Sequence, residues 1–88
     1  MRSEVVTVRF DQRLRYLMEI AARRQRRTVS SFIETAVEKA LSEVKLDDTQ
    51  TVIDAAQEIW DVDEHDRLVK LSRKFPHLLT YEEELSLK

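Results

Sequence analysis

The residues of this chain with the clearest capacity for binding a charged ligand are its arginines, which are concentrated in the first half. Residues 1–45 contain ten Lys or Arg side chains against six Asp or Glu, and eight of those ten are Arg. Residues 46–88 contain five against eleven, so balances of +4 (ten minus six) and −6 (five minus eleven) underlie the net charge of −2. This asymmetry indicates a polyanion-binding part joined to an acidic part with a different partner. The alternative is two solvated faces without a binding role, because net charge governs association and not fold.

Residues 5–10 alternate in character, which is the pattern of a β-strand with two different faces. One face consists of Val6, Val8 and Phe10, and the other consists of Val5, Thr7 and Arg9. An arginine can donate two hydrogen bonds to guanine, a threonine can bond a base or present its methyl group to thymine, and a valine can pack against that methyl. No second strand of similar quality exists in the sequence, so this backbone needs a partner. We predict that it pairs with the same strand of a second copy, giving a homodimer.

Missing residue types exclude several classes of protein. The chain has no cysteine, which excludes disulfides, thiolate metal sites and thiol catalysis, and fits a cytoplasmic location. It has no glycine, which the phosphate-binding loops of Walker and dinucleotide type require. No apolar stretch approaches the roughly 20 residues of a membrane span, and the N-terminus lacks an apolar signal core. No nucleophile–base spacing stands out, so we expect neither an enzyme nor a cofactor.

The two histidines, His65 and His77, are the only side chains that suggest a metal site. They are twelve residues apart, separated by Pro76, and form no His-X-His pattern. Without cysteine, these two residues make a weak set of ligands for a divalent cation. We therefore predict no metal site, and we expect His65 to lie at a solvated helix start among acidic residues.

The first half continues with two helices joined by a tight corner. Asp11 is a plausible N-cap for a helix over residues 12–25, which ends in the basic run 23–27. Thr28 is a plausible cap for a second helix, and an apolar stripe at helical spacing follows it as far as Val44. The corner calls for a left-handed residue at position 25 or 26, where a residue other than glycine costs roughly 1 kcal/mol.

The second half changes character after a polar boundary at residues 45–50. Residues 52–60 suit a short amphipathic helix, and Asp61 to Glu64 resemble a capping box that opens another helix. Pro76 is expected to stop that helix. Thr80 to Glu83 form a second capping-box pattern before a terminal turn.

The order strand, short turn, helix, tight corner, helix over residues 5–44 resembles the ribbon-helix-helix family of DNA-binding proteins. The segment 6–10 is similar to the alternating strand of that family, and residues 28–33 are similar to the start of its second helix. The resemblance implies a mostly α protein with one strand and two helices per chain, intertwined as a dimer through an antiparallel β-ribbon. Residues 1–45 would form this dimerisation and DNA-binding domain, and residues 46–88 an acidic helical extension.

The resemblance also implies roles for particular residues. Val5, Thr7 and Arg9 would read base edges in the major groove, and the cap and backbone amides at Thr28, Val29 and Ser30 would bind phosphate. Further phosphate neighbours would be Arg2, Arg13 and Arg27. Double-stranded DNA would be the partner of a homodimer that forms higher oligomers on neighbouring sites. The sequence departs from the family pattern at Val5, where a polar or basic residue is more usual.

Two interpretations of the second half remain open. Trp60 can anchor this segment onto its own dimer, or a partner-binding surface can be formed by Trp60, Leu68, Leu71 and Phe75, since aromatic anchors dominate many interfaces. Many ribbon-helix-helix antitoxins use C-terminal extensions to bind a toxin protein. We therefore predict a transcriptional regulator acting as a repressor, with an antitoxin that neutralises a protein partner as the alternative.

Overall fold

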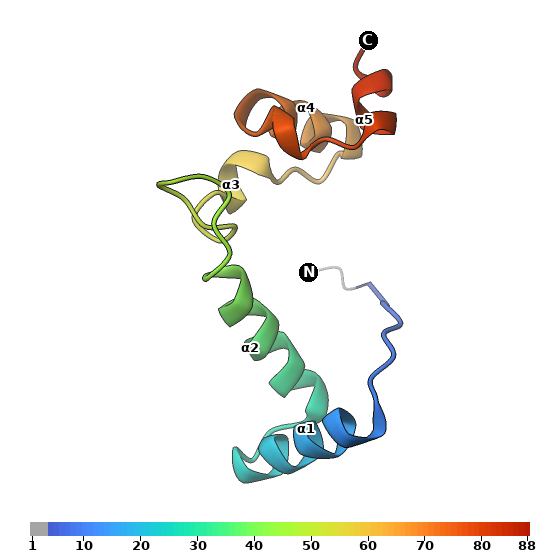
Figure 1. Ribbon diagram of the computed structural model, residues 1–88, viewed down its shortest axis with the longest axis vertical. Helices are drawn as coiled ribbons and strands as arrows, with labels where there is room; N and C mark the ends of the chain where they lie inside the picture. Colours follow the sequence, from blue (N-terminus) through green and yellow to red (C-terminus); the bar gives the residue numbers. More distant parts are fainter. Residues whose placement is uncertain (1–3) are drawn as a thin grey trace. The chain divides into compact units, whose positions relative to one another are not determined.

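The structure is a computed structural model that describes residues 4–88, and its regular elements are helices (Figure 1). They are α1 (Gln12–Arg24), α2 (Val29–Leu41), α3 (Ala56–Ile59), α4 (Glu64–Lys74), the 3₁₀ turn η1 (Pro76–Leu78) and α5 (Tyr81–Ser86). The chain divides into two compact units, one ending at Val37 and the other beginning at Glu38. The predicted boundary after residue 45 lies on the C-terminal side of this division. No helix within residues 4–88 combines the length and apolarity needed to cross a membrane.

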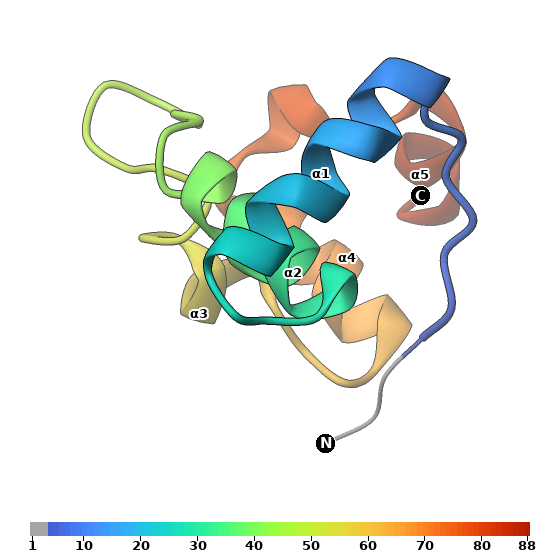
Figure 2. The same ribbon diagram turned by 90° about the horizontal axis from the view of Figure 1, so that it is seen from below.

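Residues 4–11 precede α1 without regular secondary structure, and both views draw them as a simple tube (Figures 1 and 2). The expected strand at 5–10 is therefore absent from the described part of the single chain. An isolated strand has backbone N–H and C=O groups on both edges that no strand of its own chain pairs. The mostly α class is confirmed, and a strand that forms between two copies stays a prediction.

Helix α1 begins where the sequence indicated. The Asp11 carboxylate accepts a hydrogen bond from the Leu14 N–H at 2.7 Å, which satisfies one of the free donors of the first turn. At the other end, the Arg26 N–H donates to the Arg23 carbonyl at 3.1 Å and the Arg27 N–H donates to the Ala22 carbonyl at 3.0 Å. These two bonds are the Schellman pattern of a helix C-terminus.

Arg26 has a φ of 55° and is the one non-glycine residue with positive φ among residues 4–88. Glycine usually occupies this position because it lacks the Cβ atom that clashes in the left-handed conformation. The prediction of a left-handed residue at position 25 or 26 is confirmed at position 26. The corner is thereby tight enough for α2 to begin at Val29.

Helix α2 is capped by Thr28, whose hydroxyl accepts the Ser31 N–H at 3.0 Å. The helix ends at Leu41, earlier than the apolar stripe to Val44 predicted. Two 3₁₀-type bonds close its end, from the Ser42 N–H to the Lys39 carbonyl and from the Glu43 N–H to the Ala40 carbonyl. Val44 lies beyond the helix, where its carbonyl accepts the Val52 N–H at 2.9 Å and its side chain is 52% exposed.

In the second unit, a polar turn follows the end of α2 and precedes α3, α4, η1 and α5. Lys45 and Thr51 form an isolated antiparallel bridge, and the Asp47 carboxylate accepts the N–H groups of Thr49 and Gln50, both at 2.8 Å. These bonds hold the pKa of Asp47 below its ordinary value, because they stabilise the ionised carboxylate. The predicted polar boundary is thus an ordered turn.

The predicted N-terminal cap is wrong for α4 and right for α5. The N-cap of α4 is Asp63, which accepts the Asp66 N–H at 2.9 Å, so the capping box predicted to open at Asp61 is wrong. Asp61 instead accepts the Asp63 N–H at 3.0 Å, one step before the helix. At α5, the Thr80 hydroxyl accepts the Glu83 N–H at 3.1 Å, and the Glu83 carboxylate accepts the Thr80 N–H at 3.0 Å. The second predicted capping box is therefore confirmed.

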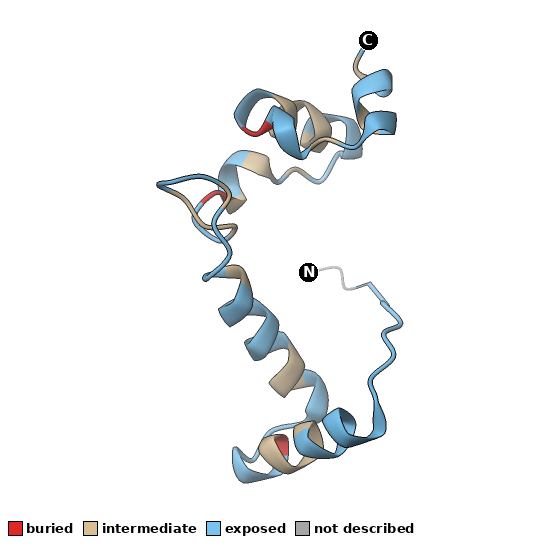
Figure 3. Cartoon of the chain, viewed as in Figure 1, coloured by how far each residue is buried: buried red, intermediate tan, exposed pale blue. Residues whose placement is uncertain are grey.

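Buried side chains are few in both units (Figure 3). Ala22 is the buried residue of the first unit as described, and Ala55 and Phe75 are those of the second. Phe75 follows α4 as its C-cap, and Pro76 then starts η1, so the predicted stop is confirmed. A single buried alanine is too small a core to stabilise the first unit by itself.

Candidate functional site

The predicted base-reading residues Val5, Thr7 and Arg9 all lie in the segment before α1 and are all exposed. None of them belongs to a regular element of the described chain. The predicted phosphate neighbour Arg2 lies outside the described residues. The segment therefore presents its polar and apolar side chains to solvent alike.

The apolar side chains of the same segment are not covered by their own unit. Val6 is 77% exposed, Val8 is 60% exposed and Phe10 is 39% exposed. Leu14 and Leu17 on α1 are also exposed. These five side chains therefore leave much of their apolar surface to solvent in the single chain.

Helix α2 begins at Val29, two residues after the basic run 23–27. The Thr28 hydroxyl is used by the Ser31 N–H, and the first intrahelical bond runs from the Phe32 N–H to the Thr28 carbonyl. The N–H groups of Val29 and Ser30 thus belong to the first turn, whose donors have no carbonyl partner inside the helix. Helix N-termini of this kind attract anions.

The two remaining predicted phosphate neighbours differ in their surroundings. Arg13 is exposed in the first turn of α1, beside Tyr16 and Glu19 at a shallow hollow. The Arg27 guanidinium donates a hydrogen bond from Nη1 to the Thr35 hydroxyl at 2.6 Å, so it lies along α2. The structure thus places the Arg27 guanidinium at Thr35, in the middle of α2, and leaves Arg13 on the open surface of α1.

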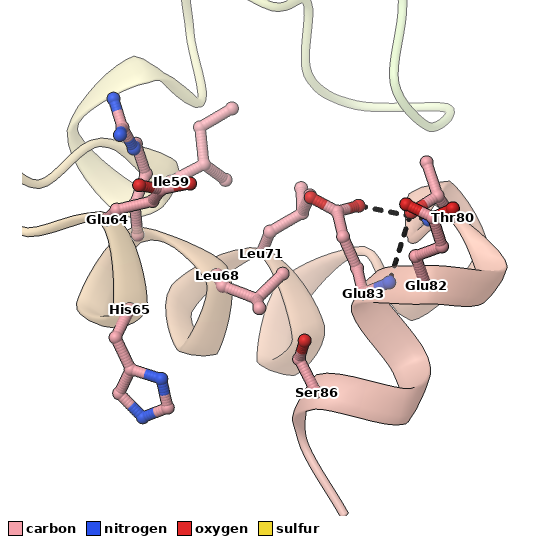
Figure 4. A pocket seen from close by; sticks show the side chains of 10 residues that line it. Ile59, Glu64, His65, Leu68, Leu71, Thr80, Glu82, Glu83 and Ser86 are labelled. Atoms are coloured by element: carbon pink, nitrogen blue, oxygen red, sulfur yellow. Dashed lines mark hydrogen bonds between the residues drawn. The ribbon is translucent and has the colours of Figure 1, made fainter.

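A hollow of about 920 Å³ lies in the second unit at α4 and α5 (Figure 4). Its lining residues are Ile59, Glu64, His65, Arg67, Leu68, Leu71, Thr80, Glu82, Glu83 and Ser86. The side chains of Leu68 and Leu71 lie in its middle, with the start of α5 on one side, while the His65 ring points away from them (Figure 4). The hollow therefore has an apolar floor and a largely acidic rim.

Trp60 lies at the end of α3 and is 56% exposed. The Arg67 guanidinium lies over its ring, with 4.9 Å between the Cζ atom and the ring centroid. The Lys70 ammonium donates to the Trp60 carbonyl at 3.0 Å and pairs with the Asp61 carboxylate at 3.0 Å. These contacts fasten the segment before α4 onto α4 itself.

The pKa of the Asp61 carboxyl is lowered for two reasons. The larger is the hydrogen bond from the Asp63 N–H, and the second is the hydrogen bond from Lys70. Both favour the ionised carboxylate.

Four residues were predicted as partner anchors. Leu68 and Leu71 line the same hollow, whereas Trp60 is exposed and does not line it. Phe75 is only 1% exposed, so its side chain belongs to the core of the second unit and is not offered to a partner. This burial could not be predicted from the sequence, because the apolar period of α4 and its C-cap does not show which residues face inward. The acidic rim residues Glu64 and Glu82 were missed, although the capping box at Thr80 could have located the start of α5.

His77 packs edge-on against the Phe75 ring at 6.2 Å between centroids, and no group of three metal-ligating side chains occurs among residues 4–88. Comparisons of the chain with protein-family models, with curated proteins and with solved structures found no match.

Proposed function

We propose that this chain is a homodimeric, sequence-specific DNA-binding regulator that acts as a repressor. In this proposal the segment 5–10 pairs with its copy in an antiparallel β-ribbon of ribbon-helix-helix type, and the ribbon enters the major groove. Residues Val5, Thr7 and Arg9 then point toward the base edges.

The observation that supports the proposal most directly is the exposure of Val6, Val8 and Phe10 on an Arg-rich unit that has almost no core of its own. Full burial of an apolar side chain of this size is worth about 1.5–3 kcal/mol. Two copies would contribute six such side chains, enough to oppose the roughly 4–15 kcal/mol of freedom lost on association. Pairing of the two strands would also satisfy their backbone groups.

The positions of charge in the first unit suit a DNA backbone. Arg13 is open on α1, and the free N–H groups of Val29 and Ser30 point out of the start of α2. Contacts of this kind set the register of a protein on DNA, whereas the ribbon side chains would select the sequence. Each phosphate contact adds about one unit to the salt dependence of log K.

The test is a gel-shift titration of the full chain against the DNA upstream of its own gene, at two salt concentrations. Arg9→Ala is expected to cost about 1–3 kcal/mol of specific binding, because a bidentate contact to guanine is lost. Arg73→Ala makes the same charge change on an exposed residue of the second unit, to which the proposal assigns no DNA contact, and should leave the affinity within about twofold. Equal losses in the two variants would refute the base-reading role of Arg9.

A second variant tests the dimer separately. Phe10→Ala is expected to dissociate and unfold the first unit, at roughly 3–5 kcal/mol for a buried aromatic. Sedimentation velocity measures the mass of both variants. A Phe10→Ala chain that remains dimeric and binds DNA normally would contradict the ribbon.

A second candidate function is that of an antitoxin, whose second unit binds and neutralises a protein. The acidic second half and the open hollow with Leu68 and Leu71 in its middle support it. It is compatible with DNA binding, because the first unit would contribute the DNA-binding surface.

A further inference from the structure

We infer that the hollow of the second unit binds an amphipathic, positively charged helix of a partner protein. This inference rests on the second candidate function and does not require the first unit to bind DNA. Its floor would be Ile59, Leu68 and Leu71, and its rim Glu64, Glu82 and Glu83.

The floor is an apolar stripe that its own unit leaves incomplete. Leu68 and Leu71 are three residues apart on α4, so they lie on one face of that helix, and both are only half-buried. Helix α5 starts beside them, yet its own Tyr81 and Leu85 remain exposed. The apolar side chains of α5 therefore do not cover the Leu68 and Leu71 floor of the hollow.

Another face of α4, which carries Lys70 and Lys74, already contacts residues of the same unit. Lys70 pairs with Asp61, and the Lys74 ammonium lies 3.3 Å from the Glu58 carboxylate. These pairs hold α3 and the segment after it against α4. The Leu68 and Leu71 stripe is thus the open side of a helix whose other contacts are fixed, which pre-forms the hollow before a partner arrives.

The rim specifies the charge of the occupant. No ion pair of residues 4–88 involves Glu64 or Glu82, and both are exposed at the edge of the hollow. The Glu83 carboxylate accepts the Thr80 N–H, and the one cation of the rim, Arg67, lies over Trp60. Arginine or lysine residues of a partner would find unpaired carboxylates on this rim, which favours a basic partner.

The nature of the floor argues for a helix over a small molecule. Small-molecule sites orient their ligands with a few buried polar groups, and no polar or charged residue is buried within the described part of this chain. An amphipathic helix needs no such groups, because its apolar face supplies the contact and its flanking charges supply the direction. The floor and rim of this hollow match that mode.

The test uses isothermal titration calorimetry of the full chain with a synthetic amphipathic peptide of leucine and arginine. Two substitutions form a matched pair, because Glu82 and Glu84 both lie in the first turn of α5 and only Glu82 lines the hollow. Glu82→Lys is expected to weaken binding about tenfold or more, since it places a like charge at the rim, whereas Glu84→Lys should change it less than about twofold. A peptide with glutamate in place of arginine should not bind.

Each other outcome overturns the inference. Equal weakening by Glu82→Lys and Glu84→Lys would show attraction by net charge alone, and equal binding of a scrambled peptide would show that the apolar floor is not used. A loss of higher oligomers in Glu82→Lys without added peptide would make a second copy of the chain the occupant. Gel shifts with the same two variants separate the proposals, because an unchanged DNA affinity leaves the regulator intact when the peptide result fails.

Discussion

Glycine at position 26 is expected to stabilise the first unit, and glycine at the preceding position is expected to destabilise it. The two residues are neighbours in the corner after α1, but Arg26 has a φ of 55° and Gln25 has a φ of −90°. Only the former is a left-handed conformation in which a Cβ atom is crowded.

The size of the effect follows from that difference. An L-residue in the left-handed conformation costs roughly 1–2 kcal/mol, and glycine removes this cost. Glycine also gains about 0.4–1 kcal/mol of freedom in the unfolded chain, which offsets part of the benefit. We therefore expect the free energy of unfolding of Arg26→Gly to be about 0.5–1 kcal/mol higher than that of Arg26→Ala. At Gln25, glycine brings only the greater freedom of the unfolded chain. The free energy of unfolding of Gln25→Gly should therefore be about 0.5–1 kcal/mol lower than that of Gln25→Ala.

Alanine at each position is the control, because it removes the side chain and retains the Cβ atom. Urea unfolding followed by far-UV circular dichroism measures the four variants at one protein concentration, since the stability of a dimer depends on concentration. The slope with urea should stay constant within the set. A glycine effect of the same sign at both positions would refute the reasoning, because the corner would then not depend on the left-handed residue.

Three further predictions concern the second unit. Phe75→Ala should cost roughly 3–5 kcal/mol because it empties the core of this unit, and thermal unfolding should show the loss; a cost below 1 kcal/mol would contradict its burial. Thr80→Ala should lower α5 stability by about 1 kcal/mol through loss of the capping box, with faster amide exchange at Glu83 as the measure; unchanged exchange there would contradict the cap. The lowered pKa of Asp61 means that its stabilising effect is complete above the ordinary Asp range near 3.9 and is lost as the pH falls through the folded pKa. In Asp61→Asn the melting temperature should therefore fall less steeply as the pH is lowered through the acid range. An identical fall in both proteins would contradict the stabilisation of the Asp61 carboxylate by Lys70 and the Asp63 N–H.

The features predicted correctly from the sequence are those fixed by neighbours three or four residues apart. Asp11 and Thr28 each cap the helix that follows, and Thr80 completes a capping box, because a short side chain reaches only the N–H groups just ahead of it. Arg26 is left-handed because two helices joined by so few residues need such a turn. Local geometry decided each of these positions.

The features that the sequence did not fix depend on contacts distant in the chain. Asp61 and Asp63 are equally good caps by type, and the pairing of Asp61 with Lys70 from the next helix accompanies the choice of Asp63. Phe75 belongs to the same apolar series as Leu68 and Leu71, yet only packing within the unit made it a core residue. The segment 5–10 is the extreme case, because its expected partner lies outside the chain.

The position of the one tryptophan makes the second unit separately observable. Trp60 is the only such residue in the sequence, and its indole lies beneath the Arg67 guanidinium at the end of α3. Its intrinsic fluorescence therefore reports on the junction of α3 and α4 and is silent about the Arg-rich unit, which contains no tryptophan. Emission and ellipticity recorded on the same sample would show whether the two units melt as one cooperative body or in succession.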